Sequence, residues 1–375
     1  MGAHILLVGA GHAHLTILKN LNNLLLQGHK VTVISAEIYH YYSGMGPGML
    51  SGIYSPQQIR FHVEKMVTDQ GGHFIRDQVI HIDPVNRNVQ TESNGKISYD
   101  VACFNTGSHV PYPEITKTLN GEEFLFPVKP IQNLLFAKNK MSFLLKRKRL
   151  KIMVVGGGAA GVEIAANLRA LAENFKQDTD ITIVTGGNLL NRFNDRFIVA
   201  AKTMLQRLSI NLLERSGVKA ISNNCIILNT GLSLQCDMVL WAVGTKPSPL
   251  FKDSGLPTGP DGGLLVNEYL QSVHFPNIFG GGDCISFKNH PLEKVGVYAV
   301  RQNPILLKNL NNFINEKQLA PFVPQKAFLT ILNMGNGQGL LKWKNLVFKG
   351  LTVFWLKDFI DQRFMKKFQI SNERD

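Results

Sequence analysis

Two segments of the chain repeat one pattern of apolar and polar positions. The first opens with an apolar run at 5–8, continues with leucines at helical spacing from Leu15 to Leu25, and closes with a β-branched run at 31–34. A glycine-rich turn separates the apolar run from the leucines. Strand, glycine-rich turn, helix and strand in this order form the unit that binds dinucleotides in α/β proteins.

The second segment follows the same plan. Its apolar run at 152–155 leads into a glycine-rich turn, a helical pattern that reaches Leu171, and a β-branched run at 181–184. A similar strand closes each copy, at 100–107 and at 237–244. One glycine motif alone is weak evidence, but two in the same strand–turn–helix context make coincidence a poor explanation.

The two turns are the predicted dinucleotide sites. Backbone amides in such a turn approach a pyrophosphate, and the dipole of the following helix favours its negative charge. We assign contacts to residues of the turns and closing strands: Gly9, Ala10, Gly11, His12, Ala13, Thr106, Gly107, Gly156, Gly158, Gly161 and Gly244. His14 departs from the motif, because a small residue normally allows the helix to pack closely there. We expect His14 to point aside or to push the helix outward, with packing favoured over a catalytic role for His12 or His14.

The carboxylate that usually binds the ribose at the end of the second strand is missing from both copies. Ser35 and Thr185 stand at these positions. We expect Glu37 to reach the ribose of the first dinucleotide, and we count Val79 among its contacts. Thr185 leaves the choice between NADH and NADPH open.

Proline- and glycine-rich stretches indicate the domain limits. They predict a first dinucleotide domain at 1–110 and 245–320, a second at 111–244, and a C-terminal module at 321–375. The expected fold class is α/β, with two three-layer Rossmann-like domains, the second inserted in the first, and a small C-terminal α+β module. The length of 375 residues suits two or three domains.

Late in the chain an apolar strand runs into Gly282 and Asp283. Here the sequence resembles the FAD-dependent pyridine nucleotide-disulfide oxidoreductases, and its glycine motifs occur in the order of that family. The resemblance implies FAD in the first domain and NAD(P)H in the second, with Asp283 hydrogen-bonded to the ribityl chain of FAD. It also implies that a helix beginning near Gly296 and Val297 faces the flavin.

Shorter segments resemble a branch akin to type II NADH dehydrogenases, sometimes fused ahead of selenophosphate synthetase: 42–48, 128–130, 185–187, 296–302, 357–358 and 361–365. This resemblance implies two catalytic candidates. Glu163 is expected near the nicotinamide, and Lys294 is expected to stabilise a reduced, anionic flavin together with the helix dipole. The alternatives are a glutamate on a helix surface and a solvated lysine.

The four cysteines decide among the redox chemistries of this family: Cys103, Cys225, Cys236 and Cys284. Residues 38–60 contain none, which excludes the dithiol relay of the disulfide reductases. No cysteine follows Cys284, which disfavours sulfide:quinone reduction. We expect free thiols, no metal site, and direct flavin chemistry, in which hydride passes from the nicotinamide to the flavin and electrons pass on to a quinone-like small molecule.

The acceptor is less well defined. Type II dehydrogenases carry an Ala-Gln-x-Ala-x-Gln-Gln pattern beside the quinone, and only Ala299 and Gln302 match it here. Reduction of a soluble sulfur or selenium acceptor and a flavin-binding redox sensor therefore stay open as alternatives. The basic and aromatic segment 340–369 suits a membrane surface, and packing on the FAD domain or in a homodimer is the other interpretation.

The net charge of +13 suits anionic partners such as dinucleotides or acidic lipids, and no nucleic-acid motif occurs. We find neither a signal peptide nor an apolar stretch of the roughly 20 residues that a membrane helix needs. The expected location is the cytoplasm or the cytoplasmic face of a membrane.

Overall fold

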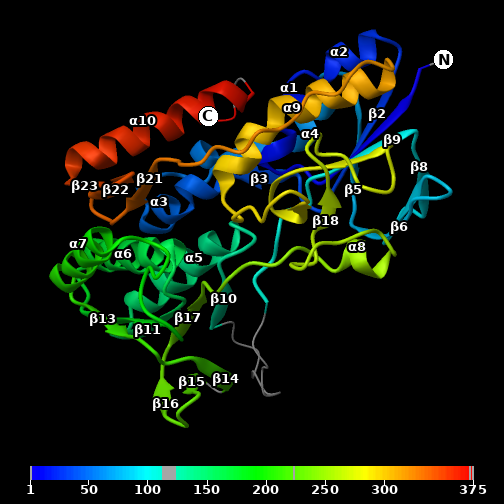
Figure 1. Cartoon of the computed structure of the whole chain (residues 1–375). Helices are drawn as coiled ribbons and strands as arrows, with labels where there is room; N and C mark the ends of the chain where they lie inside the picture. The colour runs from blue at the N-terminus through cyan, green and yellow to red at the C-terminus, as the bar shows by residue number, and fades with distance from the viewer. Residues whose placement is uncertain (1, 112–123, 223, 371–372, 374–375) are drawn as a thin grey trace.

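Two parallel five-stranded sheets form the centre of the molecule (Figure 1). The computed structural model describes residues 2–111, 124–222, 224–370 and 373. The first sheet has the strand order β19-β9-β1-β2-β5. Its strands are β1 (His4–Val8), β2 (Lys30–Ser35), β5 (His73–Arg76), β9 (Val101–Phe104) and β19 (Ile278–Gly280). The central strands β1 and β9 are buried almost throughout, as expected for a parallel sheet covered on both faces.

The second sheet repeats this arrangement with the strand order β10-β17-β11-β12-β13. Its strands are β10 (Leu125–Pro127), β11 (Leu150–Val155), β12 (Thr179–Val184), β13 (Ile210–Leu213) and β17 (Met238–Trp241). β11 pairs in parallel with β12 and β17, just as β1 pairs with β2 and β9. The predicted α/β class with two Rossmann-like units is confirmed.

The chain enters the second sheet before it completes the first. β19 belongs to the first sheet but follows every strand of the second in sequence. The second unit is therefore inserted in the first. The numerical domain limits stay predictions, and residues 112–123, near the start of the expected second domain at 111–244, lie outside the described residues.

Helices of the second unit pack on its sheet. α6 starts at the second glycine turn and packs on β12, while α7 packs on β13 and α5 on β10. Gly161 permits this approach, because a Cβ there would lie 1.9 Å from the carbonyl oxygen of Gly156. The helices of this unit are α5 (Asn133–Leu145), α6 (Ala159–Asn174) and α7 (Asp195–Arg207), while α8 (Leu250–Asp253) follows the second sheet and packs against the first unit.

The first glycine turn is followed by a broken helix, where the sequence predicts a continuous one. The pieces are η1 (His12–His14), α1 (Leu15–Lys19) and α2 (Leu21–Leu26). Asn20 separates α1 from α2, and its side-chain nitrogen donates to the carbonyl oxygen of Thr16 at 2.7 Å. Asparagine competes with the helix backbone in this way. The apolar spacing still buries Leu15, Leu18 and Leu21.

Smaller elements complete the first unit. α9 packs against η1 and α1, and α4 packs on β5. The helical elements are η2 (Ser43–Met45), α3 (Gly46–Ser51), η3 (Gln57–Ile59), α4 (Val63–Thr68), η4 (Gly282–Cys284) and α9 (Gly296–Ile314). The added strands are β3 (Tyr39–Tyr41), β4 (Arg60–His62), β6 (Val79–Asp83), β7 (Asn88–Thr91), β8 (Lys96–Ser98), β18 (Leu264–Val266) and β20 (Ile285–Phe287). The second unit has the matching meander of β14 (Val218–Ser222), β15 (Cys225–Leu228) and β16 (Ser233–Gln235).

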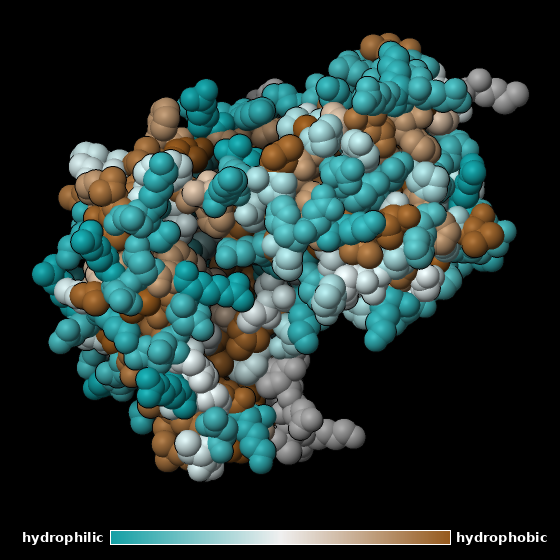
Figure 2. All heavy atoms as spheres, viewed as in Figure 1, coloured by the Kyte–Doolittle hydropathy of each residue, from teal (hydrophilic) through white to brown (hydrophobic). Residues whose placement is uncertain are grey.

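The C-terminal module is a three-stranded antiparallel sheet covered by a long helix. It consists of β21 (Thr330–Asn333), β22 (Gly339–Trp343), β23 (Leu346–Gly350) and α10 (Leu351–Phe368). α10 packs on β22, and β21 packs on α6 of the second unit. Figure 2 shows exposed hydrophobic residues in the region of α10 and β23, at the upper left of the view.

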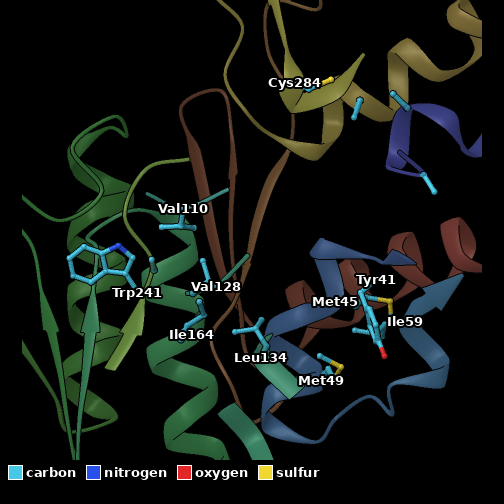
Figure 3. Packing of buried hydrophobic residues seen from close by; sticks show 14 of the residues in the cluster. Tyr41, Met45, Met49, Ile59, Val110, Val128, Leu134, Ile164, Trp241 and Cys284 are labelled. Carbon is cyan, nitrogen blue, oxygen red and sulfur yellow. The ribbon is translucent and has the colours of Figure 1, made fainter. Parts of the chain in front are cut away.

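A shared apolar core joins the two units. α3 of the first unit packs between α5 and α6 of the second. Met49 lies next to Leu134 in this layer, with Ile164 beyond Leu134 (Figure 3), and all three are buried. Burial of apolar side chains is the main stabilising contribution to such an interface, so the two glycine turns are held in a fixed relation.

Candidate active site

Asn105 fastens the first glycine turn to the neighbouring strands. Gly9 has a φ of +82°, which favours glycine. The side-chain oxygen of Asn105 accepts from the amide of Ala13 at 3.0 Å, and its side-chain nitrogen donates to the carbonyl of Gly281 at 2.5 Å. A Cβ on Gly11 would lie 2.3 Å from Asn105 Oδ1. Asn105 joins the segments that follow β1, β9 and β19, and no sequence motif predicted this role.

His14 packs between the first glycine turn and β9. Its Nδ1 lies 2.6 Å from the carbonyl oxygen of Gly9, and its Nε2 lies 3.2 Å from Cys103 Sγ. Burial lowers the pKa of His14 to about 4, against the opposite effect of the bond to Gly9, so the ring is neutral at pH 7. Burial also raises the pKa of the Cys103 thiol, which is therefore a poor nucleophile.

His12 belongs to an aromatic cluster on the other side of the turn. Its Nδ1 lies 3.1 Å from His40 Nε2, and its ring is next to those of Tyr42 and Phe364. Burial, and to a smaller extent the charge of Lys129, lowers the pKa of His12 to about 4. The first turn thus contacts α10 of the C-terminal module through neutral rings.

A cavity of about 510 Å³ follows the carboxyl ends of β1, β2 and β9. Ligands of open parallel sheets bind at this edge. Most of the residues predicted for the first dinucleotide line it: Gly9, Ala10, Gly11, His12, Ser35, Glu37, Val79, Thr106, Gly107, Gly282, Asp283, Lys294 and Gly296. Ala13 lies buried beneath the turn, and Val297 lies half-buried in the first turn of α9, so these two do not line the cavity.

Asp283 is paired with a lysine that sequence reasoning did not assign to the site. Lys129 Nζ lies 2.5 Å from Asp283 Oδ2 and 2.9 Å from Ser108 Oγ, and the Ser108 hydroxyl donates to Asp283 at 2.7 Å. All three residues line the cavity. Lys129 follows β10 and therefore brings a positive charge from the second unit into the cavity of the first. The sequence of 128–130 indicates a family resemblance but does not predict this ion pair.

Lys294 also lines the cavity, but its ammonium group is bound elsewhere. Its Nζ lies 2.6 Å from Asp261 Oδ2 and donates to the carbonyl oxygen of Ile285 at 2.5 Å. Asp261 in turn accepts from the hydroxyl of Ser286. α9 begins two residues later with no side-chain cap, so its amide groups are available at the cavity wall. The contact of Lys294 with the flavin stays a prediction.

The predicted ribose end of the cavity is more open. The hydroxyl of Ser35 donates to the carbonyl oxygen of Glu37 at 2.9 Å. The carboxylate of Glu37 lies 3.6 Å from Arg76, and both side chains are more than half exposed. Glu37 can therefore turn towards a ligand at little cost, because exposed ion pairs are weak.

The second glycine turn has the same backbone plan in a more open setting. Gly156 has a φ of +133° and packs against the carbonyl of Ala242, as Gly9 packs against Asn105. Gly158 precedes α6 without a side-chain cap, and a Cβ there would meet no atom within 4 Å. Thr185 is buried against Gly157, and Gly244 follows β17 with open space around it.

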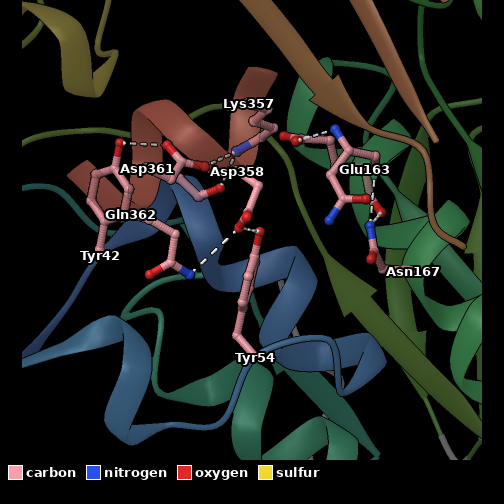
Figure 4. Close-up of polar contacts among 10 residues, drawn as sticks. Tyr42, Tyr54, Glu163, Asn167, Lys357, Asp358, Asp361 and Gln362 are labelled. Atoms are coloured by element: carbon pink, nitrogen blue, oxygen red, sulfur yellow. Dashed lines mark hydrogen bonds and ion pairs between the residues drawn. The ribbon is translucent and has the colours of Figure 1, made fainter. Parts of the chain in front are cut away.

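Glu163 lies where α6 meets the C-terminal module (Figure 4). Its carboxylate accepts from the amide of Asn333 at 2.8 Å. Burial raises the pKa of Glu163 to about 7, and Asp361 adds to the rise, while Lys357 and the Asn333 amide oppose it. Lys357 Nζ lies 2.6 Å from Asp361 Oδ2 and 2.6 Å from the carbonyl oxygen of Gly44.

Two tyrosines extend this polar cluster into the first unit. Tyr42 donates to Asp361 at 3.0 Å, and Tyr54 donates to Asp358 at 2.7 Å. Burial and the neighbouring carboxylates raise the pKa of both phenols, so they stay protonated at neutral pH. The cluster therefore connects the C-terminal module to both dinucleotide units, through Asn333 to Glu163 and through α10 to the two tyrosines.

Gln302 has a structural contact inside the first unit. Its side-chain oxygen accepts from the amide of Gly282 at 2.6 Å, and the residue is 1% exposed. Ala299 is also buried, one turn earlier on α9, and lines the cavity. The two residues that match the quinone pattern therefore support the segment around Asp283, and the side chain of Gln302 is already in use.

The comparison with known proteins decides the family. The model of the pyridine nucleotide-disulphide oxidoreductases matches residues 3–303, which is most of the chain. The protein belongs to this family. The match spans both dinucleotide units and ends within α9, before the C-terminal module.

Relatives within the family include several NADH dehydrogenases. The chain is 22% identical over 373 residues to a probable NADH dehydrogenase of Dictyostelium discoideum, which covers 90% of this chain and 80% of that protein. It is 22% identical to the NADH dehydrogenase-like protein YutJ of Bacillus subtilis, over 92% of this chain and 94% of that protein. The mitochondrial external alternative NAD(P)H-ubiquinone oxidoreductase B1 of Solanum tuberosum is 24% identical over 76% of this chain. The match covers 56% of the length of that protein.

Solved structures of two oxidoreductases have the same fold. The NDH2 of Plasmodium falciparum in complex with NADH superposes with a TM-score of 0.83 at 19% identity, over 97% of this chain and 96% of that one. The sulfide:quinone oxidoreductase of Aquifex aeolicus gives a TM-score of 0.81 at 18% identity, over 98% and 92%. These likenesses confirm the predicted fold, and the branch akin to type II NADH dehydrogenases is confirmed by the named relatives.

The residues of this pyridine nucleotide-disulphide oxidoreductase fit FAD in the first unit. The glycine turn is held tightly by Asn105, and the cavity beside it contains Asp283 and the uncapped start of α9. The second turn fits a dinucleotide too, because the amides at the start of α6 have no side-chain cap. Among the residues that the structure describes, no cluster of His, Cys, Asp or Glu could hold a metal ion.

Proposed function

We propose that the protein is an FAD-dependent NAD(P)H dehydrogenase that passes hydride from the nicotinamide to the flavin and electrons on to a quinone-like acceptor. One observation carries the proposal: a single cavity is lined by the first glycine turn, by Asp283, and by Lys129 of the second unit. The two units therefore meet at the site expected for the flavin. The family and the named relatives support the same reaction.

Each part of the site has a separate task in this proposal. The turn at 9–11 binds the pyrophosphate of FAD, and the turn at 156–158 binds that of NAD(P)H. Bound FAD supplies the ring that accepts hydride, and the packed α3–α5–α6 interface positions the nicotinamide against it. Lys129 and the start of α9 stabilise negative charge in the cavity. Glu163, with its pKa of about 7, holds or releases a proton at neutral pH.

The cysteines support direct flavin chemistry without a redox disulfide. All four are free thiols, and none lines the cavity. Burial raises the pKa of Cys103, Cys236 and Cys284. Thiolates are the reactive form in disulfide exchange, so these groups are unsuited to it.

Anaerobic turnover with a panel of acceptors tests the reaction. We expect NADH or NADPH to reduce the bound flavin and a water-soluble quinone to sustain many turnovers. Turnover with sulfur or selenium compounds alone would move the acceptor to the soluble alternative. Reduction of the flavin without turnover on any acceptor would favour the redox sensor.

We also propose that the C-terminal module docks on an anionic membrane surface. One side of α10 and the β22–β23 hairpin carries exposed apolar side chains: Trp343, Leu346, Phe348, Leu351, Trp355, Leu356, Phe359 and Ile360. Residues 340–369 hold seven Lys or Arg against two Asp. Basic and aromatic side chains together favour the interface of an anionic bilayer. Among the described residues, no helix combines the length and apolarity needed to cross a membrane.

Flotation with liposomes tests this docking. Trp355 and Phe359 are 64% and 63% exposed, so the double change Trp355→Glu and Phe359→Glu should leave the fold intact. We expect the parent protein to float with vesicles that contain phosphatidylglycerol and the double variant to stay behind. Leu26→Glu, at a 77% exposed site on α2, is the matched control. A parent protein that never floats contradicts the proposal. If the parent protein sediments as a dimer and the double variant sediments as a monomer, this face instead binds a second copy of the chain.

A further inference from the structure

The strand ends beside the second glycine turn bring together residues that are far apart in sequence. β12 ends at Val184 and β13 at Leu213, and the two strands are neighbours in the sheet. The amide of Thr185 donates to the carbonyl of Leu213 at 2.9 Å, and the amide of Arg215 donates to the carbonyl of Gly187 at 3.1 Å. Arg215 therefore lies beside the loop that follows β12.

This is the place where the adenosine ribose of a dinucleotide lies in Rossmann-like units. Units that bind NADH carry a carboxylate there, which accepts hydrogen bonds from the ribose hydroxyls. Thr185 stands at that position and is buried against Gly157. The nearby Glu214 is already engaged, because one carboxylate oxygen accepts from the amide of Leu189 at 2.6 Å and the other lies 2.7 Å from Lys202.

Arg215 is exposed and held in place by the same loop. Its Nε donates to Asn188 Oδ1 at 3.2 Å. Within the described part of the chain, no carboxylate forms an ion pair with Arg215. Gly186 and Gly187 leave space around the loop, where a Cβ on either would have its nearest contact at 3.5 Å or more. A backbone amide and the charges of Lys202 and Arg215 lower the pKa of the Glu214 carboxylate, so one carboxylate faces two cations. The edge of this site thus keeps a net positive charge where a carboxylate would favour NADH.

We propose that the second dinucleotide carries a 2′-phosphate, so that the protein prefers NADPH, and that Arg215 binds this phosphate with Asn188 beside it. A guanidinium matches the geometry of a phosphate and forms strong, charge-assisted hydrogen bonds with it. A carboxylate at the same place would instead repel the phosphate. The inference rests on the proposed function, because it concerns the adenosine end of the same nicotinamide site.

Binding of adenosine fragments tests the inference apart from catalysis. We expect 2′,5′-ADP to bind the FAD-loaded protein at least about tenfold more tightly than 5′-AMP, and Arg215→Ala to remove that difference. Arg207→Ala is the matched control, because Arg207 is an exposed arginine just before the other end of β13. Arg192→Ala distinguishes Arg215 from Arg192, the exposed arginine in the loop that follows β12.

Stopped-flow reduction of the flavin gives the second readout. We expect Arg215→Ala to raise the apparent Kd for NADPH about tenfold or more and to change that for NADH less than about twofold. Three results would each overturn the inference. Arg215→Ala could weaken the binding of both nucleotides equally, the parent protein could prefer NADH, or only Arg192→Ala could lose affinity for NADPH. Failure of both nucleotides to reduce the flavin would contradict the proposed function instead, and the fragment affinities would still decide the role of Arg215.

Discussion

The two glycine turns have the same sequence plan but different surroundings. Gly11 and Gly158 occupy equivalent places, each before a helix and each with a negative φ. A Cβ on Gly11 would strike Asn105, which is itself fixed by two hydrogen bonds, whereas a Cβ on Gly158 would meet nothing within 4 Å. The first turn also contacts α9 through η1, and it contacts α10 through His12 and Phe364. The second turn leads into α6, and the space around Gly158 is open.

This difference suits two kinds of ligand. A rigid, enclosed turn favours a cofactor that stays bound, because its binding groups are already in place and the surrounding elements restrict exit. An open turn favours a nucleotide that binds and leaves in every turnover. The chain thus uses one motif twice, and the packing around each copy determines which role it has.

Alanine at the two equivalent glycines gives the largest expected contrast. We expect Gly11→Ala to lose most of its FAD and to unfold more easily by about 1–3 kcal/mol, because overpacking in a fixed environment has this cost. Gly158→Ala should keep its FAD and its stability but bind NAD(P)H more weakly. Flavin content per polypeptide and urea unfolding measure both effects. Equal flavin loss in the two variants would refute the proposed difference.

Glu163 lies on α6, which follows the second turn, and it contacts the C-terminal module. Its titration is expected to make the stability of the protein depend on pH. Its pKa is about 7 in the folded protein and near 4.5 in an unfolded chain, so the folded protein binds more protons between these values. Its contribution to stability is therefore present below pH 4.5 and lost as pH rises through 7.

Glu163→Gln removes this titration. We expect the stability of the variant relative to the parent to rise by on the order of 1–3 kcal/mol between pH 5 and pH 8. Urea unfolding at several pH values measures it, and the comparison cancels the titration of the buried histidines. Glu173→Gln, at an exposed position on α6, is the control. A flat difference across this range would show that Glu163 titrates normally.

Lys129 is an exception to the separation of the two sites, because it belongs to the second unit but lines the cavity of the first. In Lys129→Gln, Asp283 loses its cation and places a negative charge beside the flavin. We expect the two-electron midpoint potential of FAD to fall by roughly 10–30 mV, since 30 mV corresponds to about 1.4 kcal/mol. Lys294→Gln should shift it less, because Lys294 already binds Asp261. Spectroelectrochemistry of both variants decides, and a larger shift in Lys294→Gln would return the role to Lys294.

The repeated local pattern made the architecture predictable. The runs at 5–8 and 152–155 and the glycines after them dictate strands and turns through neighbouring residues alone. The break at Asn20 was missed, because the leucine spacing of α1 and α2 is that of one continuous helix. The contact of His14 with Cys103 was not predictable either, because these two residues are 89 positions apart in sequence.

The missed site residues share one property. Asn105, Lys129 and the proposed phosphate ligand Arg215 are positioned by tertiary contacts between segments that are separated in sequence, and none belongs to a glycine motif. The conspicuous Lys294 lies on the cavity wall but directs its charge to Asp261. The spacing of a motif therefore predicts which edge of the sheet binds the ligand. Only the tertiary packing shows which charged side chains point towards that ligand.

We infer that two dinucleotides meet in one chain, and anaerobic titration of the purified protein with NADPH and NADH checks this inference. We expect about one FAD per polypeptide, a yellow protein, and loss of the visible flavin absorbance on addition of about one equivalent of nucleotide. A colourless protein that takes up no FAD, or a flavin that neither nucleotide reduces, would contradict it.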